Sequence, residues 1–177
     1  MAKKATRALL IIMILLVNIS CDRVSKNIVT HRLEYNERID LIGQFLTLTR
    51  VENSGAFLSL GYNLPEPFKL IVMRLIPVLV LIFALLFVFL KTSLKNWITL
   101  GICLAIAGGV GNIYDRIIFG RVTDFIHMDF VIFQTGIFNL ADLSLMTGMC
   151  IILIGNFYND KKPGTLDNVR DLPKSDV

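Results

Sequence analysis

The sequence is poor in charged residues and in cysteine. Only 18% of its 177 residues are Asp, Glu, Lys or Arg, whereas 54% are hydrophobic and the mean hydropathy is +0.65. This composition is too apolar for an ordinary soluble domain, and the chain is long enough for several membrane spans. The three cysteines, Cys21, Cys103 and Cys150, have neither metal-ligand spacing nor a disulfide pattern, so we expect them to pack as inert side chains.

The chain also lacks the basic surface of a nucleic-acid-binding protein. Its net charge is +4 and its pI is about 9.1, but the basic residues flank the apolar runs and form no patch interleaved with aromatic residues. There is no internal repeat of the kind found in inverted-repeat transporters. His31 and His127 could join acidic residues in a metal site, but we favour a chain with no metal, no cofactor and no nucleic-acid partner.

Four apolar windows have the length of a membrane-spanning helix. They cover residues 8–22, 70–90, 97–114 and 137–158. The first is short, and with Lys3, Lys4 and Arg7 before it and Cys21 at its end it also resembles a cleavable lipoprotein signal. Asn18 occupies a position where such signals usually have Leu, and three more spans follow. We therefore favour an uncleaved first span.

The distribution of basic residues predicts the orientation of the chain. Basic residues occur at the start of the chain, in the 91–95 connection and at Lys161 and Lys162, which all lie on one side of a four-span protein. The positive-inside rule makes that side, and hence both termini, cytoplasmic. We expect residues 1–158 to form one membrane domain, followed by a polar, disordered tail over residues 159–177.

The two segments on the other side, residues 23–67 and 115–136, are not simple loops. Within them, residues 44–53 and 121–136 are rich in β-branched and aromatic side chains, a pattern typical of strands. The sequence therefore predicts a mainly α membrane protein with four transmembrane helices and a small extracytoplasmic β-sheet that rests on the bilayer.

Asp142 lies inside an otherwise apolar window, where a charge costs about 2.5–3.5 kcal/mol even on lenient insertion scales. Asp124 lies in the strand-like segment just before the same window. If the two carboxylates meet, they share a proton, and one can activate water while the other protonates the substrate. Alternatively, Asp142 pairs with Arg116 and Asp124 caps a turn; spacing alone does not decide between these arrangements.

Several other polar residues lie at the same end of the predicted helices. Asp22 ends the first span, Asn112, Asp115 and Arg116 end the third, and Asn139 begins the fourth. The end of an odd span and the start of an even one share a membrane face, so these side chains should converge near Asp142. At about 1.5 Å per residue, Asp142 lies only several ångströms below that surface.

Five short motifs together resemble the lipoprotein signal peptidase family, signal peptidase II, over the chain up to about residue 158. They are DRVSK at 22–26, NSGAF at 53–57, GGVGNIYDR at 108–116, VTDF at 122–125 and FNLAD at 138–142. The resemblance implies an aspartyl endopeptidase of the bacterial cytoplasmic (inner) membrane. Such an enzyme removes the signal peptide from diacylglyceryl-modified prolipoproteins by cutting just before the lipidated cysteine, near the extracytoplasmic surface.

The resemblance also implies the roles of individual residues. Asp124 and Asp142 would be the catalytic pair. The residues that would bind substrate or support the pair are Asp22, Lys26, Asn53, Gly55, Asn112, Asp115, Arg116 and Asn139. Further expected partners are membrane lipids and inhibitory cyclic peptides of the globomycin type.

Two departures from the family pattern are visible. Phe57 follows Ala56 directly, where the family often has a second Ala, and His127 and Asp129 follow the VTDF motif where another acid is common. The first departure concerns fine substrate contacts, and neither involves the catalytic pair. A small transporter or a non-catalytic membrane scaffold is the alternative function, because either could carry acidic residues at the mouth of a helix bundle.

Overall fold

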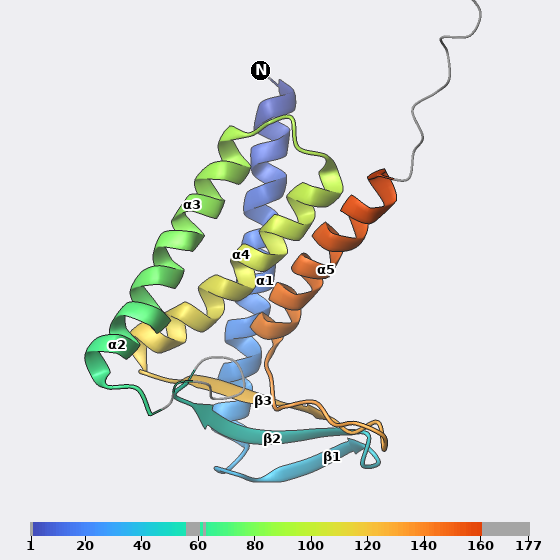
Figure 1. Ribbon diagram of the computed structural model, residues 1–177. Helices are drawn as coiled ribbons and strands as arrows, with labels where there is room; N and C mark the ends of the chain where they lie inside the picture. The colour runs from blue at the N-terminus through green and yellow to red at the C-terminus, as the bar shows by residue number, and fades with distance from the viewer. Residues whose placement is uncertain (1, 56–60, 62, 161–177) are drawn as a thin grey trace, which may run out of the picture.

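The computed structural model describes residues 2–55, 61 and 63–160 of the chain, and in this part four helical segments are long and apolar enough to span a membrane. They are Lys4–Arg32, Glu66–Leu90, Asn96–Ile118 and Leu140–Phe157. The helices are α1 (Ala2–Arg32), α2 (Glu66–Leu70), α3 (Ile76–Leu90), α4 (Asn96–Ile118) and α5 (Leu140–Asp160), with a π-helical turn, η2 (Ile71–Leu75), between α2 and α3. The prediction of four spanning helices with a small sheet is confirmed (Figure 1).

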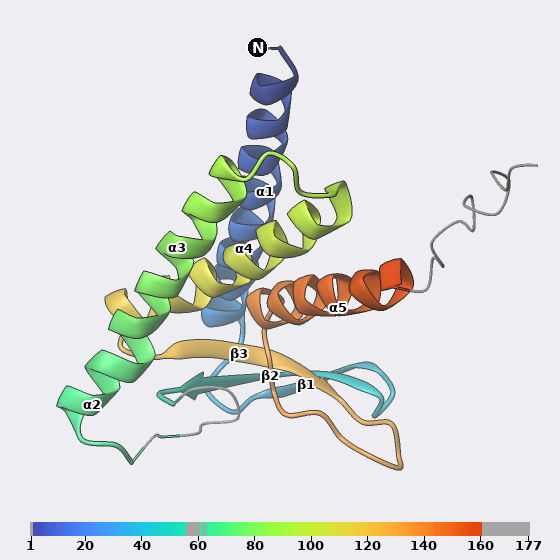
Figure 2. The same cartoon turned by 45° about the horizontal axis from the view of Figure 1, so that its top comes forward.

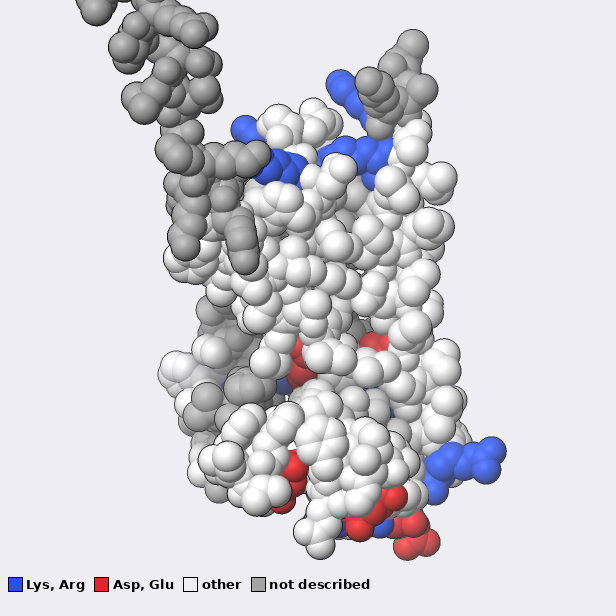
Figure 3. All heavy atoms as spheres, turned by 90° about the vertical axis from the view of Figure 1, so that its right-hand side faces the viewer, with Lys and Arg blue, Asp and Glu red and all other residues white. Residues whose placement is uncertain are grey.

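The charges are distributed as expected for a protein that crosses a bilayer. Lys and Arg atoms gather at the end of the molecule near the N-terminus, and an almost uncharged belt separates them from the charges at the other end (Figure 3). Acidic atoms are visible in a recess below that belt. At the basic end, Arg7 donates hydrogen bonds to the carbonyl oxygens of Val88 and Lys91, which ties the start of α1 to the end of α3.

Helix α1 is longer than the apolar window predicts. It continues to Arg32, so Asp22 lies well inside the helix rather than at its end. The reason is the spacing of Asp22, Lys26 and Val29. They are four and three residues apart, so they lie on one face of the helix, and all three are buried there. Burial of this face stabilises the helix beyond the end of the apolar run.

Helices α4 and α5 pack closely because glycine lies at their contacts. A Cβ atom added to Gly148 would lie 2.7 Å from the backbone nitrogen of Ala105. One added to Gly108 would lie 2.8 Å from the backbone nitrogen of Leu145 and would also meet the carbonyl oxygen of Ala141. Only glycine allows this approach, which is the usual role of small residues between membrane helices.

The sheet lies across one end of the bundle (Figures 1 and 2). Its strands are β1 (Arg38–Ile42), β2 (Leu46–Asn53) and β3 (Val122–Met128), antiparallel in the order β1-β2-β3. Strand β2 falls within the predicted segment 44–53, whereas β1 was not predicted. The β1 side chains are all exposed, so the strand carries no alternation of buried and exposed residues.

The predicted strand over residues 121–136 is only partly correct. Strand β3 ends at Met128, and the chain then turns back, so that the Thr135 N–H donates to the carbonyl oxygen of Met128 and Phe138 bridges to Ile126. The turn requires a positive φ of 69° at Val131, which a strand does not permit. This return segment delivers the chain to the start of α5.

We predict that Gly108→Ala destabilises the protein, because the new methyl group would meet the backbone of α5, which cannot move without separating the helices. Overpacking of this kind costs about 1–3 kcal/mol. Gly109→Ala is the matched control, since the atoms nearest to its Cβ would belong to the side chain of Leu81, which can change rotamer. Thermal unfolding in detergent should show a lower Tm for Gly108→Ala alone, and equal Tm values for the two variants would contradict this packing argument.

Candidate active site

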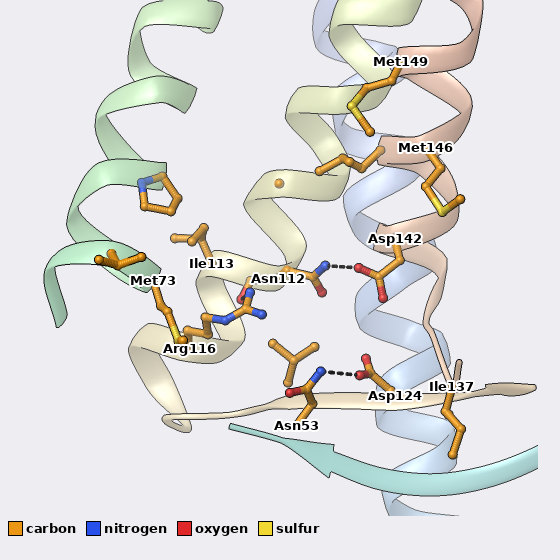
Figure 4. Close-up of a pocket in the computed structure, with 15 residues that line it drawn as sticks. Asn53, Met73, Asn112, Ile113, Arg116, Asp124, Ile137, Asp142, Met146 and Met149 are labelled. Carbon is orange, nitrogen blue, oxygen red and sulfur yellow. Dashed lines mark hydrogen bonds between the residues drawn. The ribbon is translucent and has the colours of Figure 1, made fainter. Parts of the chain in front are cut away.

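A cavity of about 550 Å³ lies where the sheet meets α4, α5 and the start of the second spanning segment. Asp124 and Asp142 both line it, together with Asn53, Asn112 and Arg116 (Figure 4). The rest of the lining is mainly apolar: Val72, Met73, Pro77, Gly109, Ile113, Val122, Ile137, Leu145, Met146 and Met149. The cavity therefore combines a polar floor with apolar walls formed by the spanning helices.

Asp124 is held on β3, with its side chain turned toward the helices. Strand pairing places Val51 opposite Asp124 and Asn53 opposite Val122, which brings the Asn53 amide to the carboxylate. Asn53 Nδ2 donates to Oδ2 of Asp124 at 3.0 Å, and Asn139 Nδ2 donates to Oδ1 at 2.6 Å. Only 5% of Asp124 is exposed.

Burial raises the pKa of Asp124 from 3.8 to about 6. The hydrogen bond from Asn53 opposes this increase in the pKa, and the negative charge of Asp142 adds to it. A raised carboxyl pKa means that the folded protein binds this proton more tightly than the unfolded chain. Asp124 therefore lowers the stability as the pH rises from about 4 to about 6, a contribution of up to about 3 kcal/mol. Such a cost at one buried carboxyl is typical of a functional group.

Asp142 lies in the first turn of α5, where Asn139 caps the helix. The Asp142 N–H donates to Oδ1 of Asn139 at 2.9 Å, and the Asn139 N–H donates back to Oδ2 of Asp142 at 3.2 Å. This reciprocal pair is a capping box, in which each side chain satisfies a backbone donor that the helix leaves unpaired. Asn112 Nδ2 donates to the other carboxylate oxygen, Oδ1, at 2.7 Å.

Two asparagine side chains connect the carboxylates. Asn139 Nδ2, which donates to Asp124, also lies 3.1 Å from Oδ1 of Asn112, and Asn112 in turn donates to Asp142. No ion pair within the described residues joins Arg116 to Asp142, and Asp124 lies within a strand. The geometry therefore favours two linked carboxylates over the alternative in which Asp142 pairs with Arg116 and Asp124 caps a turn.

A buried ionic cluster lies directly behind these asparagines. Lys26 Nζ is 2.9 Å from Oδ2 of Asp22 and 2.7 Å from Oδ2 of Asp115, and all three side chains are almost completely buried. Oδ1 of Asp22 accepts a hydrogen bond from the Ala141 N–H at 3.0 Å, so the cluster reaches the start of α5. Arg23 also pairs with Asp115.

The cluster determines which way the Asn112 amide faces. Lys26 Nζ donates to Oδ1 of Asn112 at 3.1 Å, and an ammonium group can only donate. The oxygen of the amide must therefore face Lys26, which leaves its nitrogen to face Asp142. Arg23 was not among the predicted site residues, although it stands beside Asp22 in the first motif.

Arg116 points into the cavity from the last turn of α4 (Figure 4). Its Nη2 donates to the carbonyl oxygen of Gly55 at 3.0 Å, and its Nη1 donates to that of Asn112 at 3.3 Å. Gly55 is itself held by the Asn53 side chain, which accepts from its N–H at 2.9 Å. Residues 56 and 57, where the sequence departs from the family pattern, lie outside the described residues.

Three methionines on the cavity wall were not predicted as site residues. Met146 and Met149 project from α5, and Met73 projects from the π-helical turn on the opposite side (Figure 4). The three-residue spacing of Met146 and Met149 on one face of α5 is the signal that could have indicated them. Methionine adapts to irregular apolar ligands because its side chain is unbranched and polarizable.

Comparison with known proteins gives the same family as the motifs. Residues 13–158 match the model of the family described as signal peptidase (SPase) II. The lipoprotein signal peptidase of Streptococcus pneumoniae is 33% identical, over 84% of this chain and 92% of that protein, and the one of Chlorobium phaeobacteroides is 37% identical, over 78% and 88%. The chain belongs to the signal peptidase II family.

Solved structures agree with this assignment. Two structures described as bacterial membrane enzymes match with TM-scores of 0.78 and 0.72, at 28% and 29% identity. The first match covers 88% of this chain and 92% of the other, and the second covers 82% and 91%. As a signal peptidase II, the chain is a bacterial membrane protease of the aspartic type, and the scaffold or transporter alternative is not favoured.

We predict that Lys26→Met strongly destabilises the protein, because it leaves Asp22 and Asp115 buried without their shared cation. Breaking a buried ion pair in this way costs about 3–5 kcal/mol. The matched control is Arg38→Met, which removes the Arg38–Asp40 pair on β1, where both side chains are more than half exposed. An exposed pair contributes less than about 1 kcal/mol. Equal losses of Tm in the two variants would contradict a structural role for Lys26.

Proposed function

We propose that this enzyme removes signal peptides from diacylglyceryl-modified prolipoproteins by cutting before the lipidated cysteine, with Asp124 and Asp142 as the catalytic pair. The observation that carries the proposal is the shared hydrogen-bond network: both carboxylates line one cavity and are linked through Asn139 and Asn112. The lipoprotein substrate is suggested by the names of the relatives.

The two carboxylates provide both proton-transfer functions of peptide hydrolysis. Asp124, with its pKa raised to about 6, carries the proton that is donated, and Asp142, which accepts two N–H hydrogen bonds, acts as the base. Asp142 takes a proton from water as the water oxygen attacks the scissile carbonyl carbon, while Asp124 protonates the carbonyl oxygen. Asp142 then passes its proton to the leaving amine as the C–N bond breaks, and Asp124 takes back a proton from a hydroxyl of the tetrahedral intermediate as the C=O bond re-forms.

Arg116, Asn53 and Gly55 are suited to bind the substrate backbone beside the pair. Arg116 is a permanent cation with several N–H groups, and it lines the cavity. An extended peptide in the cavity could accept from these groups. Asp22, Lys26, Asn112, Asp115 and Asn139 support the pair from behind.

The apolar walls are suited to the lipid and signal-peptide portions of the substrate. Met73, Met146 and Met149 face this part of the cavity. A substrate anchored in the bilayer would reach it by lateral diffusion between the spanning helices. Membrane lipids and cyclic peptides of the globomycin type are expected to compete for the same space.

The proposed orientation places both termini in the cytoplasm and the catalytic pair near the extracytoplasmic surface. It is supported by the basic end of the molecule, where Arg7 donates to the carbonyl oxygen of Lys91 (Figure 3), and by the sheet at the opposite end (Figure 1). By the positive-inside rule, the basic end is cytoplasmic. In this orientation, exported prolipoproteins would reach the catalytic pair from the extracytoplasmic side of the membrane.

The decisive experiment compares Asp124→Asn and Asp142→Asn with wild type in a gel-shift assay on a diacylglyceryl-modified precursor. Each variant should lose at least about 100-fold in turnover, because each removes one proton-transfer function. Asp40→Asn, on exposed β1, is the matched control and should retain activity. The unmodified precursor should be cut far more slowly than the lipidated one.

Near-normal turnover in either active-site variant would refute the catalytic assignment. Equal rates on the two precursors would refute the lipoprotein specificity while leaving the catalytic pair intact. Circular dichroism and thermal unfolding of each variant distinguish lost chemistry from lost folding.

A further inference from the structure

The turn between β3 and the return segment carries an exposed apolar surface. We call residues Phe130, Val131, Ile132 and Phe133 the apolar tip. Val131 is 96% exposed and Ile132 is 94% exposed, whereas Phe130 and Phe133 are partly covered by their neighbours. Four consecutive large apolar residues at the end of a turn are unusual on a surface that meets only water.

The apolar tip is held in one conformation by hydrogen bonds at its base. Both oxygens of Asp129 are used there, because Oδ1 accepts from the Val131 N–H and Oδ2 accepts from the Gln134 side chain, each at 2.8 Å. The Phe130 N–H also donates to the carbonyl oxygen of Phe133 at 2.9 Å. Asp129, which the sequence left without a role, thus organises this turn.

Aromatic packing joins the apolar tip to the neighbouring hairpin. The Phe130 ring stacks on Phe133 with centroids 4.6 Å apart and meets the edge of Phe45, between β1 and β2, at 5.0 Å. Val131 has a positive φ of 69°, a strained conformation for a β-branched residue. The backbone of Val131 is therefore strained in a turn that leaves the side chains of Val131 and Ile132 exposed. Strained backbone conformations of this kind are typical of functional turns.

The position of the apolar tip relative to α5 identifies its partner. The tip projects beyond the helix bundle on the side of α5 (Figure 2), and only residues 134–139 separate it from the first turn of that helix. The same helix exposes large apolar side chains, including Leu143, Leu153 and Phe157, as expected for a surface that faces lipid. The tip and the lipid-facing helix therefore lie on the same side of the molecule and are joined by a short segment.

We propose that the apolar tip inserts into the interfacial layer of the bilayer beside α5 and anchors the sheet that carries Asp124. Burial of the tip in lipid removes its apolar side chains from water, and phenylalanine and β-branched side chains tolerate this layer without an unpaired polar group. A bilayer fits the tip better than a second copy of the chain, because the tip lies on the same side as α5, whose exposed apolar side chains are those of a lipid-facing helix. The proposal does not depend on the catalytic assignment.

The test measures the depth of a nitroxide spin label at position 132 in phosphatidylcholine–phosphatidylglycerol vesicles. The label is attached to Ile132→Cys in a chain with Cys21→Ala and Cys150→Ala; Cys103 is buried and remains. Leu153→Cys on α5 is the lipid-facing control, and Asp40→Cys on β1 is the aqueous control. Collision rates with oxygen report lipid exposure, and those with a water-soluble nickel complex report water exposure.

The label at 132 should collide with oxygen more often, and with nickel several-fold less often, than the label at 40. Collision rates equal to those at position 40 would overturn the proposal, because the tip would then be in water. Spin–spin broadening at position 132 that disappears on dilution with unlabelled protein would also overturn it, by showing that a second copy covers the tip. Both readouts are independent of peptide cleavage, so an inactive enzyme would still test the insertion.

Discussion

One buried ammonium group organises the functional end of this protein. Lys26 pairs with Asp22 on its own helix and with Asp115 on α4, Arg23 supplies a second positive charge to Asp115, and Asp22 accepts the Ala141 N–H at the start of α5. Three spanning helices therefore meet at one charge. Two carboxylates and a cation can be buried together only because each charged oxygen has a partner nearby, and the glycine contacts between α4 and α5 permit that proximity.

The chemistry of the site depends on this cluster through the Asn112 amide. Because Lys26 occupies the amide oxygen, the amide nitrogen is directed to Asp142, while Asn139 caps α5 and donates to Asp124. The two carboxylates thus differ in surroundings: one belongs to a helix cap and the other to a buried strand. Burial raises the pKa of Asp124 to about 6, so Asp124 retains a proton at a pH where ordinary carboxyls have lost theirs.

The sequence was sufficient to predict the four spanning helices, because apolar windows of that length are rare outside membrane helices. It also predicted that Asp22, Asn112 and Asn139 gather near Asp142, because alternate helix ends share one membrane face. It could not predict β1, whose five residues are all exposed, or the full length of α1, whose last turns are amphipathic. The turn after Met128 was missed because its β-branched composition favours a strand, whereas the positive φ at Val131 is a tertiary outcome.

The proton that we assign to the carboxyl pair, carried by Asp124, can be detected by infrared spectroscopy of the protein in lipid. The band of protonated carboxyl groups would be followed in wild type and Asp124→Asn as the pH is raised from about 4 to about 8. We expect a band that disappears with a midpoint near pH 6 in wild type and is missing from Asp124→Asn. A wild-type midpoint near 4, or an unchanged band in Asp124→Asn, would contradict this assignment.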